Sequence, residues 1–165
     1  GIEDTRIGVG FFYDIHQLKA CRPCILGGVY IESELGPDGH SDADVLIHAL
    51  MDAMLGAAGL RDIGYYFPPE DDQYKGISSM LLLETVNSLL KERGLQAYNI
   101  DIMVISETPK LKPHIDTMKA NLQSVLEIPL ERISIKATTN EMLGAIGRRE
   151  GIAAQAVVSV YEGEV

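Results

Sequence analysis

The stretch from Gly39 to Asp52, GHSDADVLIHALMD, constrains this chain more than any other segment. Its apolar residues, such as Leu46 and Leu50, recur at the spacing of one helix face, which predicts a buried helix. Ser41 is a good N-cap residue, and Asp44 three positions later is the expected capping-box partner. Glycines further along predict that the helix ends between positions 56 and 59.

The same helix carries a histidine between two acidic residues. Asp44, His48 and Asp52 are four residues apart, so their side chains are expected along one side of the helix. An imidazole flanked by carboxylates is typical of a metal ligand with supporting partners. His40 and Ser41 lie at the helix start, where free N–H groups and the helix dipole attract anions. We therefore expect a metal ligand within the helix and an anion site at its mouth.

Length and composition predict one domain spanning residues 1–165. Hydrophobic residues make up 46% and charged residues 23% of the chain, as in soluble globular proteins. The 24 acidic and 14 basic residues give a net charge of -10, which argues against nucleic acid as a partner. No apolar run approaches the ~20 residues of a membrane span, so a membrane is not expected as a partner either.

The two cysteines, Cys21 and Cys24, provide no disulfide framework, which favours a reducing compartment. A redox pair would begin a helix, and a structural zinc site would need a second pair. We expect two thiols without a chemical role. The chain begins at Gly1 and shows no signal sequence, so the expected compartment is a bacterial cytoplasm, or the plastid stroma if a transit peptide was removed.

Apolar periodicity predicts strands and helices in alternation, which indicates an α+β fold of the two-layer α/β type. Strands are expected at 6–18, 25–31, 98–107, 133–138 and 152–161. Beyond the first helix, helices are expected at 78–93 and 114–126, with a short one after 138–141. The acidic, proline-containing segment 60–76 is expected to be a long functional loop.

Two clusters of residues offer chemistry. Asp14 and His16 share one face of the first strand, and with His48 they would leave a fourth position open, as in catalytic zinc sites. Each of the three alone has an ordinary structural explanation, so only the combination predicts a metal site. The segment KATTNE at 136–141 could hold phosphate oxygens, with Glu141 on magnesium, although an ordinary Ser/Thr turn fits the same residues.

Further motifs follow in one order along the chain. They are Asp14-x-His16, Gly27-Gly28-Val29, His40-Ser41-Asp42-Ala43-Asp44, His48-Ala49-Leu50, Asp62-Ile63-Gly64, Phe67-Pro68, Lys75-Gly76, Pro109-Lys110, Lys136-Ala137-Thr138-Thr139 and Gly147-Arg148-x-Glu150-Gly151. From end to end the chain resembles the 2-C-methyl-D-erythritol 2,4-cyclodiphosphate synthase family. The resemblance implies a mixed β-sheet with helices packed on one face, assembled as a homotrimer around the sheets, with active sites between neighbouring subunits.

The resemblance also implies a reaction. It is that of a lyase of the non-mevalonate isoprenoid pathway, which converts 4-diphosphocytidyl-2-C-methyl-D-erythritol 2-phosphate to the 2,4-cyclodiphosphate and CMP. The 2-phosphate attacks the β-phosphate in line, with metal assistance.

Residue roles follow from the matched motifs. Zinc is implied on Asp14, His16 and His48, and magnesium or manganese on Glu141 with the substrate phosphates. His40 and Thr139 match residues that stabilise the transition state. Substrate contacts are implied for these residues and for Ser41, Asp62, Ile63, Gly64, Phe67, Asp71, Lys75, Ser79, Ser106, Pro109, Lys110, Thr138 and Arg148.

Three positions depart from the family pattern. Two extra residues lie in the stretch Phe11 to Tyr13, and a β-bulge is expected to absorb them before the zinc ligands. Pro69 replaces a common aspartate, which would remove one polar contact. Ala145 replaces a frequent aromatic residue near the implied trimer axis.

Two alternative functions fit the same residues. One is a metal-dependent phosphohydrolase acting on a nucleotide diphosphate. The other is a non-catalytic relative that binds metal or nucleotide.

Overall fold

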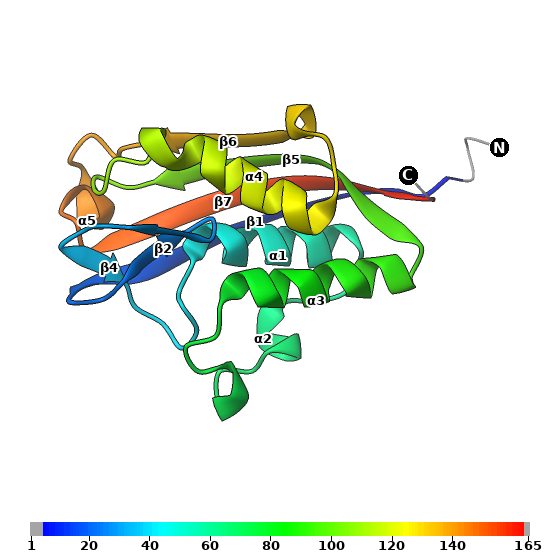
Figure 1. Ribbon diagram of the computed structural model, residues 1–165, viewed down its shortest axis with the longest axis horizontal. Helices are drawn as coiled ribbons and strands as arrows, with labels where there is room; N and C mark the ends of the chain where they lie inside the picture. The colour runs from blue at the N-terminus through cyan, green and yellow to red at the C-terminus, as the bar shows by residue number, and fades with distance from the viewer. Residues whose placement is uncertain (1–4, 164–165) are drawn as a thin grey trace.

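A five-stranded mixed sheet forms the frame of the computed structural model, which describes residues 5–163 (Figure 1). The ends of the expected 1–165 domain lie outside the described residues. The strands are β1 (Ile7–Ala20), β2 (Cys24–Leu26), β3 (Val29–Ile31), β4 (Leu35–Pro37), β5 (Leu95–Ile105), β6 (Ile133–Thr138) and β7 (Gly151–Glu162). The helices are α1 (Val45–Ala57), α2 (Ile63–Tyr66), α3 (Ser79–Glu92), α4 (Ile115–Leu126) and α5 (Gly144–Gly147).

The strand order is β4-β1-β7-β5-β6. The β5 and β6 strands are parallel, and the other neighbouring pairs are antiparallel. The α1 helix packs on β1 and β7, α4 packs on β6, and α3 contacts both helices. Figure 1 shows these three helices on the same side of the strands. The predicted mixed sheet with helices on one face is confirmed.

Two glycines of β1 bring α1 against the sheet. A Cβ atom at Gly8 would overlap the carbonyl of Ala57, and one at Gly10 would overlap that of Ala53. The close approach leaves all but one residue of α1 buried, including His48. A helix enclosed in this way can fix the direction of a side chain that it carries.

The β1 strand pairs with β7 in continuous register from Ile7–Tyr161 to Gln17–Gly151. The bulge expected near Phe11 is therefore absent from this pairing, and that expectation is wrong. An insertion of two residues preserves the two-residue alternation of a strand, so the side chains after it keep their faces.

The expected strand at 25–31 is instead a hairpin of β2 and β3. Gly27 and Gly28 form its turn with φ of 58° and 73°, which a glycine pair adopts readily. The N-cap of α1 also differs from the expectation, because Asp44 takes that place and accepts from the backbone N–H of Ile47. Ser41 lies outside the helix, which begins at Val45.

The other predicted elements agree with the structure within a few residues. The long segment after α1 contains the short helix α2 and a 3-10 turn at Asp72–Tyr74. Two further 3-10 turns lie at Lys112–His114 and Leu130–Arg132. Within residues 5–163, none of the helices has the length and apolar character needed to cross a membrane.

Candidate active site

Three potential metal ligands converge between β1 and α1. Asp14 and His16 lie two residues apart on β1 and both face α1, from which His48 projects toward them. The Nε2 atom of His16 lies 3.0 Å from Oδ2 of Asp14 and 3.3 Å from Nδ1 of His48. The third separation, from His48 Nδ1 to Asp14 Oδ2, is 3.6 Å.

The outer nitrogens of both histidines have other partners. His16 Nδ1 lies 2.9 Å from the carbonyl oxygen of Asp38, to which it can only donate. His48 Nε2 lies 3.0 Å from the hydroxyls of both Ser41 and Ser79. The neutral imidazole of His16 therefore directs a lone pair from Nε2 toward the other two ligands.

The expected carboxylate partners of His48 bind elsewhere, so that interpretation is wrong. Asp44 accepts hydrogen bonds from the backbone N–H groups of Gly27 and Gly28, at 3.0 and 2.8 Å. Asp52 accepts from the N–H of Ile63 at 2.8 Å. The interpretation failed because backbone N–H groups of neighbouring segments, and not His48, are the hydrogen-bond partners of both carboxylates.

The pKa values of the cluster reflect its close charges. Burial raises the pKa of Asp14, but hydrogen bonds and charge from His16 and His48 outweigh burial and lower it to about 2. Burial lowers the pKa of His16, yet the hydrogen bond and charge of Asp14 raise it above 6.5 on balance. The first shift favours the ionised carboxylate of Asp14, and the second favours positive charge beside it.

The donor set fits a divalent cation. One carboxylate oxygen and two imidazole nitrogens lie within 4.8 Å of one another. Asp and His are common zinc ligands, and three protein ligands leave one position for water or substrate. Asp14, His16 and His48 therefore form a candidate metal site, as predicted.

A cavity of about 240 Å³ opens beside these ligands. It is lined by His16, His40, Ser41, His48, Ile63, Gly64, Phe67, Pro69, Tyr74 and Leu82. Five residues that were predicted to contact substrate, at 40–41 and 63–67, thus line the same cavity as His16 and His48. Pro69, where an aspartate is common, contributes an apolar wall.

Other predicted residues of the same loop lie outside this lining. Asp62, Asp71 and Lys75 are not among the residues that form the cavity wall. Asp71 approaches it only through its carbonyl oxygen, 3.2 Å from Nε2 of His40. Sequence reasoning missed Tyr74 and Leu82, whose apolar side chains gave no signal apart from general core packing.

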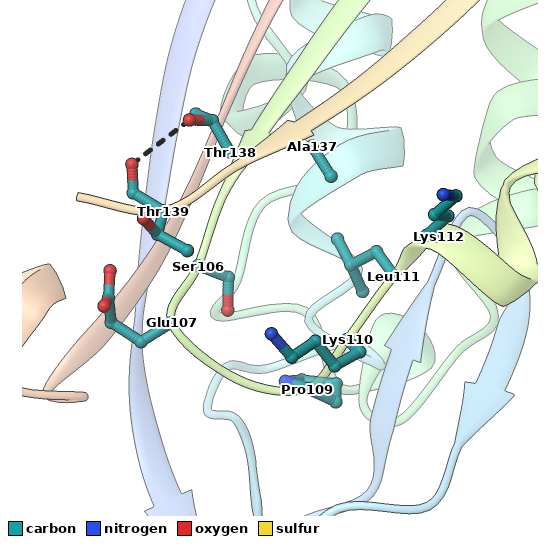
Figure 2. Close-up of a pocket in the computed structure, with 9 residues that line it drawn as sticks. All are labelled: Ser106, Glu107, Pro109, Lys110, Leu111, Lys112, Ala137, Thr138 and Thr139. Carbon is teal, nitrogen blue, oxygen red and sulfur yellow. Dashed lines mark hydrogen bonds between the residues drawn. The ribbon is translucent and has the colours of Figure 1, made fainter. Parts of the chain in front are cut away.

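A second cavity, of about 260 Å³, lies where β5 and β6 end (Figure 2). Its lining residues are Ser106, Glu107, Pro109, Lys110, Leu111, Lys112, Ala137, Thr138 and Thr139. Figure 2 shows Lys110 on the loop after β5, across the hollow from Thr138 and Thr139 at the end of β6. Hydroxyls and lysine ammonium groups around one hollow suit a phosphorylated ligand.

Glu141 and Arg148 lie outside the lining of this cavity. Glu141 is exposed beside it, and its backbone N–H donates to the hydroxyl of Thr139 at 3.2 Å. Arg148 Nε pairs with Glu150 at 2.6 Å. Glu107 supports the intervening turn by accepting hydrogen bonds from the backbone N–H groups of Asn140 and Met142.

The sequence pattern of the YgbB family matches residues 5–161. The chain belongs to the YgbB family. A curated relative from Nostoc punctiforme, named 2-C-methyl-D-erythritol 2,4-cyclodiphosphate synthase, is 57% identical over 154 residues. The alignment covers 93% of this chain and 96% of that protein.

Solved structures of similar proteins agree with this membership. The bifunctional IspDF from Campylobacter jejuni matches with a TM-score of 0.93 and 42% identity, over 98% of this chain and 44% of that one. A 2C-methyl-D-erythritol-2,4-cyclodiphosphate synthase in a CDP-bound form matches with a TM-score of 0.83 and 37% identity. That alignment covers 93% of this chain and 98% of the other.

In this YgbB-family chain the two cavities share none of the lining residues described. Across the sheet, His16 of β1 pairs with Ile152 of β7, and Ile105 of β5 pairs with both Ala153 of β7 and Thr138 of β6. His16 and the end of β6 therefore lie at nearly the same level, three strands apart. Three strand spacings of ~4.8 Å place them about 14 Å apart. The metal ligands and the second cavity are therefore separate from each other within one chain.

Proposed function

We propose that the protein is a cyclodiphosphate synthase, a lyase of non-mevalonate isoprenoid synthesis. Its substrate would be 4-diphosphocytidyl-2-C-methyl-D-erythritol 2-phosphate, and its products 2-C-methyl-D-erythritol 2,4-cyclodiphosphate and CMP. The observation that carries this proposal is that Asp14, His16 and His48 meet beside a cavity lined by the two histidines, in a chain 57% identical to a named synthase. The relative from Nostoc punctiforme also supports the bacterial cytoplasm as the compartment.

The reaction requires charge neutralisation more than proton transfer. The nucleophile is a phosphate anion, so it needs no strong general base. The difficulty is to hold two anions in line, and electrostatic positioning supplies most of the catalysis in phosphoryl transfer.

We assign zinc to Asp14, His16 and His48 because two nitrogens and one carboxylate oxygen suit that ion. When bound there, zinc supplies Lewis-acid chemistry to a phosphoryl oxygen. Magnesium or manganese would be held by Glu141 together with the substrate phosphates, since magnesium prefers few carboxylates and retains phosphate ligands.

The chain's own residues would orient the substrate from both cavities, which we call the two half-sites of the proposed active site. His40 and Ser41 line the metal-side cavity, where they would hold the methylerythritol phosphate. Lys110 and the two threonines line the other cavity, where they would hold the cytidine diphosphate. His40 and Thr139 would donate to the phosphoryl oxygens as charge develops. Asp62, Asp71, Lys75 and Arg148 would contact the substrate from the rims.

We infer a homotrimer in which neighbouring subunits join the two half-sites. The separation of the cavities in one chain supports this arrangement. The sheet face opposite α1 also exposes an apolar row on β1, which a subunit interface would cover. The exposed residues of this row are Ile7, Val9, Phe11, Tyr13 and Ile15.

Mixing two inactive variants tests the shared site. His48→Gln removes a metal ligand, and Lys110→Ala removes a cation from the other half-site. In a randomly mixed trimer, about a quarter of the sites would combine intact halves from two chains. We expect about a quarter of wild-type activity after co-refolding. No recovery above the separate variants would place both halves in one chain.

Oxygen isotopes distinguish the synthase from the two alternatives. In ¹⁸O-labelled water, a cyclisation by the 2-phosphate incorporates no solvent oxygen into either product. A phosphohydrolase would incorporate ¹⁸O, and a non-catalytic relative would return the substrate unchanged. Mass spectrometry of the products should therefore show unlabelled CMP and unlabelled cyclic diphosphate.

A further inference from the structure

The hydroxyl of Ser79 connects an acidic side chain to a metal ligand. Ser79 Oγ lies 2.5 Å from Oδ1 of Asp42 and 3.0 Å from Nε2 of His48. Ser79 is fully buried at the start of α3, and His48 is 9% exposed. The start of α3 is thus linked by hydrogen bonds to two residues, six positions apart, at the start of α1.

The donors in these two hydrogen bonds can be assigned from the groups that carry protons. An ionised carboxylate can only accept, so the single Ser79 hydroxyl proton must point to Asp42. Ser79 Oγ can then only accept from His48, so a hydrogen bond between them places a proton on Nε2, with the Ser41 hydroxyl, also 3.0 Å away, as a second acceptor. With Nε2 protonated, the neutral ring carries its lone pair on Nδ1, the atom that faces Asp14 and His16.

Asp42 is held firmly in this role. Its carboxylate also accepts from the backbone N–H of Ser79 at 2.9 Å and of Asp44 at 3.1 Å. Its own N–H donates to the carbonyl of Ile77 at 3.0 Å, and Gly76 N–H donates to the carbonyl of His40 at 2.8 Å. The segment before α1 and the segment before α3 are therefore joined around the Asp42 side chain.

We propose that Asp42 is a positioning residue that acts through Ser79 to fix the tautomer of His48 for metal binding. The proposal rests on the metal site of the proposed function. Asp42 is not among the residues that line the cavity beside the metal ligands. Partners of this kind fix ring orientation and tautomer, and their loss typically weakens metal affinity 10- to 100-fold.

The Asp42→Asn variant tests which groups donate in the hydrogen bonds that link His48, Ser79 and Asp42. With its oxygen on the Ser79 N–H, the bond of 2.9 Å, Asn places its NH₂ group at the Ser79 hydroxyl and gives up the longer bond of 3.1 Å from the Asp44 N–H. The hydroxyl proton would then turn to His48 Nε2 and favour the tautomer protonated on Nδ1. Ser79→Ala removes the link itself and keeps the Asp42 carboxylate.

The readout is ¹⁵N NMR of the metal-free protein labelled on histidine. The chain has 4 histidines, so the His48 signals can be assigned by their loss in His48→Gln. In wild type we expect a protonated, pyrrole-like Nε2 and a pyridine-like Nδ1, and we expect this pattern to be reversed in Asp42→Asn. The exposed Asp116 at the start of α4 supplies the matched control, Asp116→Asn, which should resemble wild type.

Zinc affinity is the second measurement, by competition with a chromophoric chelator. We expect about 10- to 100-fold weaker binding for Asp42→Asn and Ser79→Ala, with no further loss when the two are combined. A wild-type His48 protonated on Nδ1, or unchanged affinity in both variants, would overturn the proposal. Should wild type bind no zinc, the metal site of the proposed function fails, while the NMR result still decides the tautomer.

Discussion

Nε2 of His16 faces Nδ1 of His48 at 3.3 Å, although both rings come from different elements of the fold. The opposite nitrogen of each ring is already engaged, by the Asp38 carbonyl and by the hydroxyls of Ser41 and Ser79. Two lone pairs held this close repel each other unless a cation lies between them. The relationship between these two histidines is therefore the strongest structural argument for a bound metal.

Removing one of these rings should remove the metal. We expect His48→Gln to lose stoichiometric zinc and to lower kcat/KM by more than about 100-fold. Loss of a group that only hydrogen-bonds to a metal ligand already lowers activity or metal affinity by about 10- to 100-fold, and loss of the ligand itself should cost more. His114, a histidine before α4 that lies outside both cavity linings, provides the control His114→Gln. Metal analysis and a CMP-release assay measure both effects, and full zinc occupancy in His48→Gln would contradict the assigned ligand set.

Zinc affinity should fall on acidification through protonation of His16. The raised pKa of His16 means that this ring takes up a proton at a higher pH than an ordinary imidazole, whereas the pKa of Asp14 near 2 keeps that carboxylate ionised. The affinity should therefore decline as the pH falls and His16 becomes protonated, by about tenfold or more per pH unit once the protonated ring predominates. Zinc titrations between pH 8 and 5 measure this slope. Constant affinity down to pH 5 would be incompatible with the His16 assignment.

Asp52 should make the metal-free protein less stable as the pH rises. Burial raises the pKa of this carboxyl from 3.8 to about 6, so the folded state holds the proton more tightly than the unfolded state. Stability then falls between pH 4 and 6, and the full cost, at most roughly 3 kcal/mol, is present above that range.

Asp52→Asn should remove this cost, because the amide oxygen can still accept from the N–H of Ile63. We expect higher stability than wild type at pH 7.5 and a smaller difference at pH 4.5, measured by urea unfolding with EDTA. The surface change Asp116→Asn should leave the pH dependence as it is. A destabilised Asp52→Asn at pH 7.5 would mean that the ionised carboxylate is favourable there.

Contact between α1 and β1 should depend on Gly10. A methyl group at this position would overlap the carbonyl of Ala53, so Gly10→Ala should separate helix from strand and cost about 1–3 kcal/mol or more. Gly56 in α1 has open space around its Cβ position, and Gly56→Ala should instead stabilise the helix by up to about 1 kcal/mol. Thermal unfolding compares the two. Equal effects would indicate that the close approach at Gly10 carries no constraint.

Local patterns in the sequence were sufficient for most of the elements. The alternation along β1 placed Asp14 and His16 on one face, and helical periodicity placed His48 on the partner helix. The two extra residues near Phe11 changed nothing in this arrangement, because an even insertion preserves strand parity. The expected bulge came from comparing the length of the segment with a family pattern, without considering that parity.

Hydrogen bonds between residues far apart in the sequence could not be predicted from local sequence patterns. Spacing along α1 predicted Asp44 and Asp52 as partners of His48, and it could not show that they bind the amides of Gly28 and Ile63 instead. The link from Asp42 to Ser79 joins residues 37 positions apart, so no local pattern signals it. The Gly27-Gly28 pair did carry a hairpin signal, which the apolar residues around it obscured.

Phosphorus NMR of the zinc- and magnesium-loaded protein with the cytidine diphosphate substrate tests the central claim most directly. We predict that the signals of the cyclic diphosphate and of CMP grow in equal amounts, and that both stop when EDTA removes the metals. Linear phosphate products, or an unchanged substrate with fully loaded protein, would contradict the assignment of this site to cyclisation.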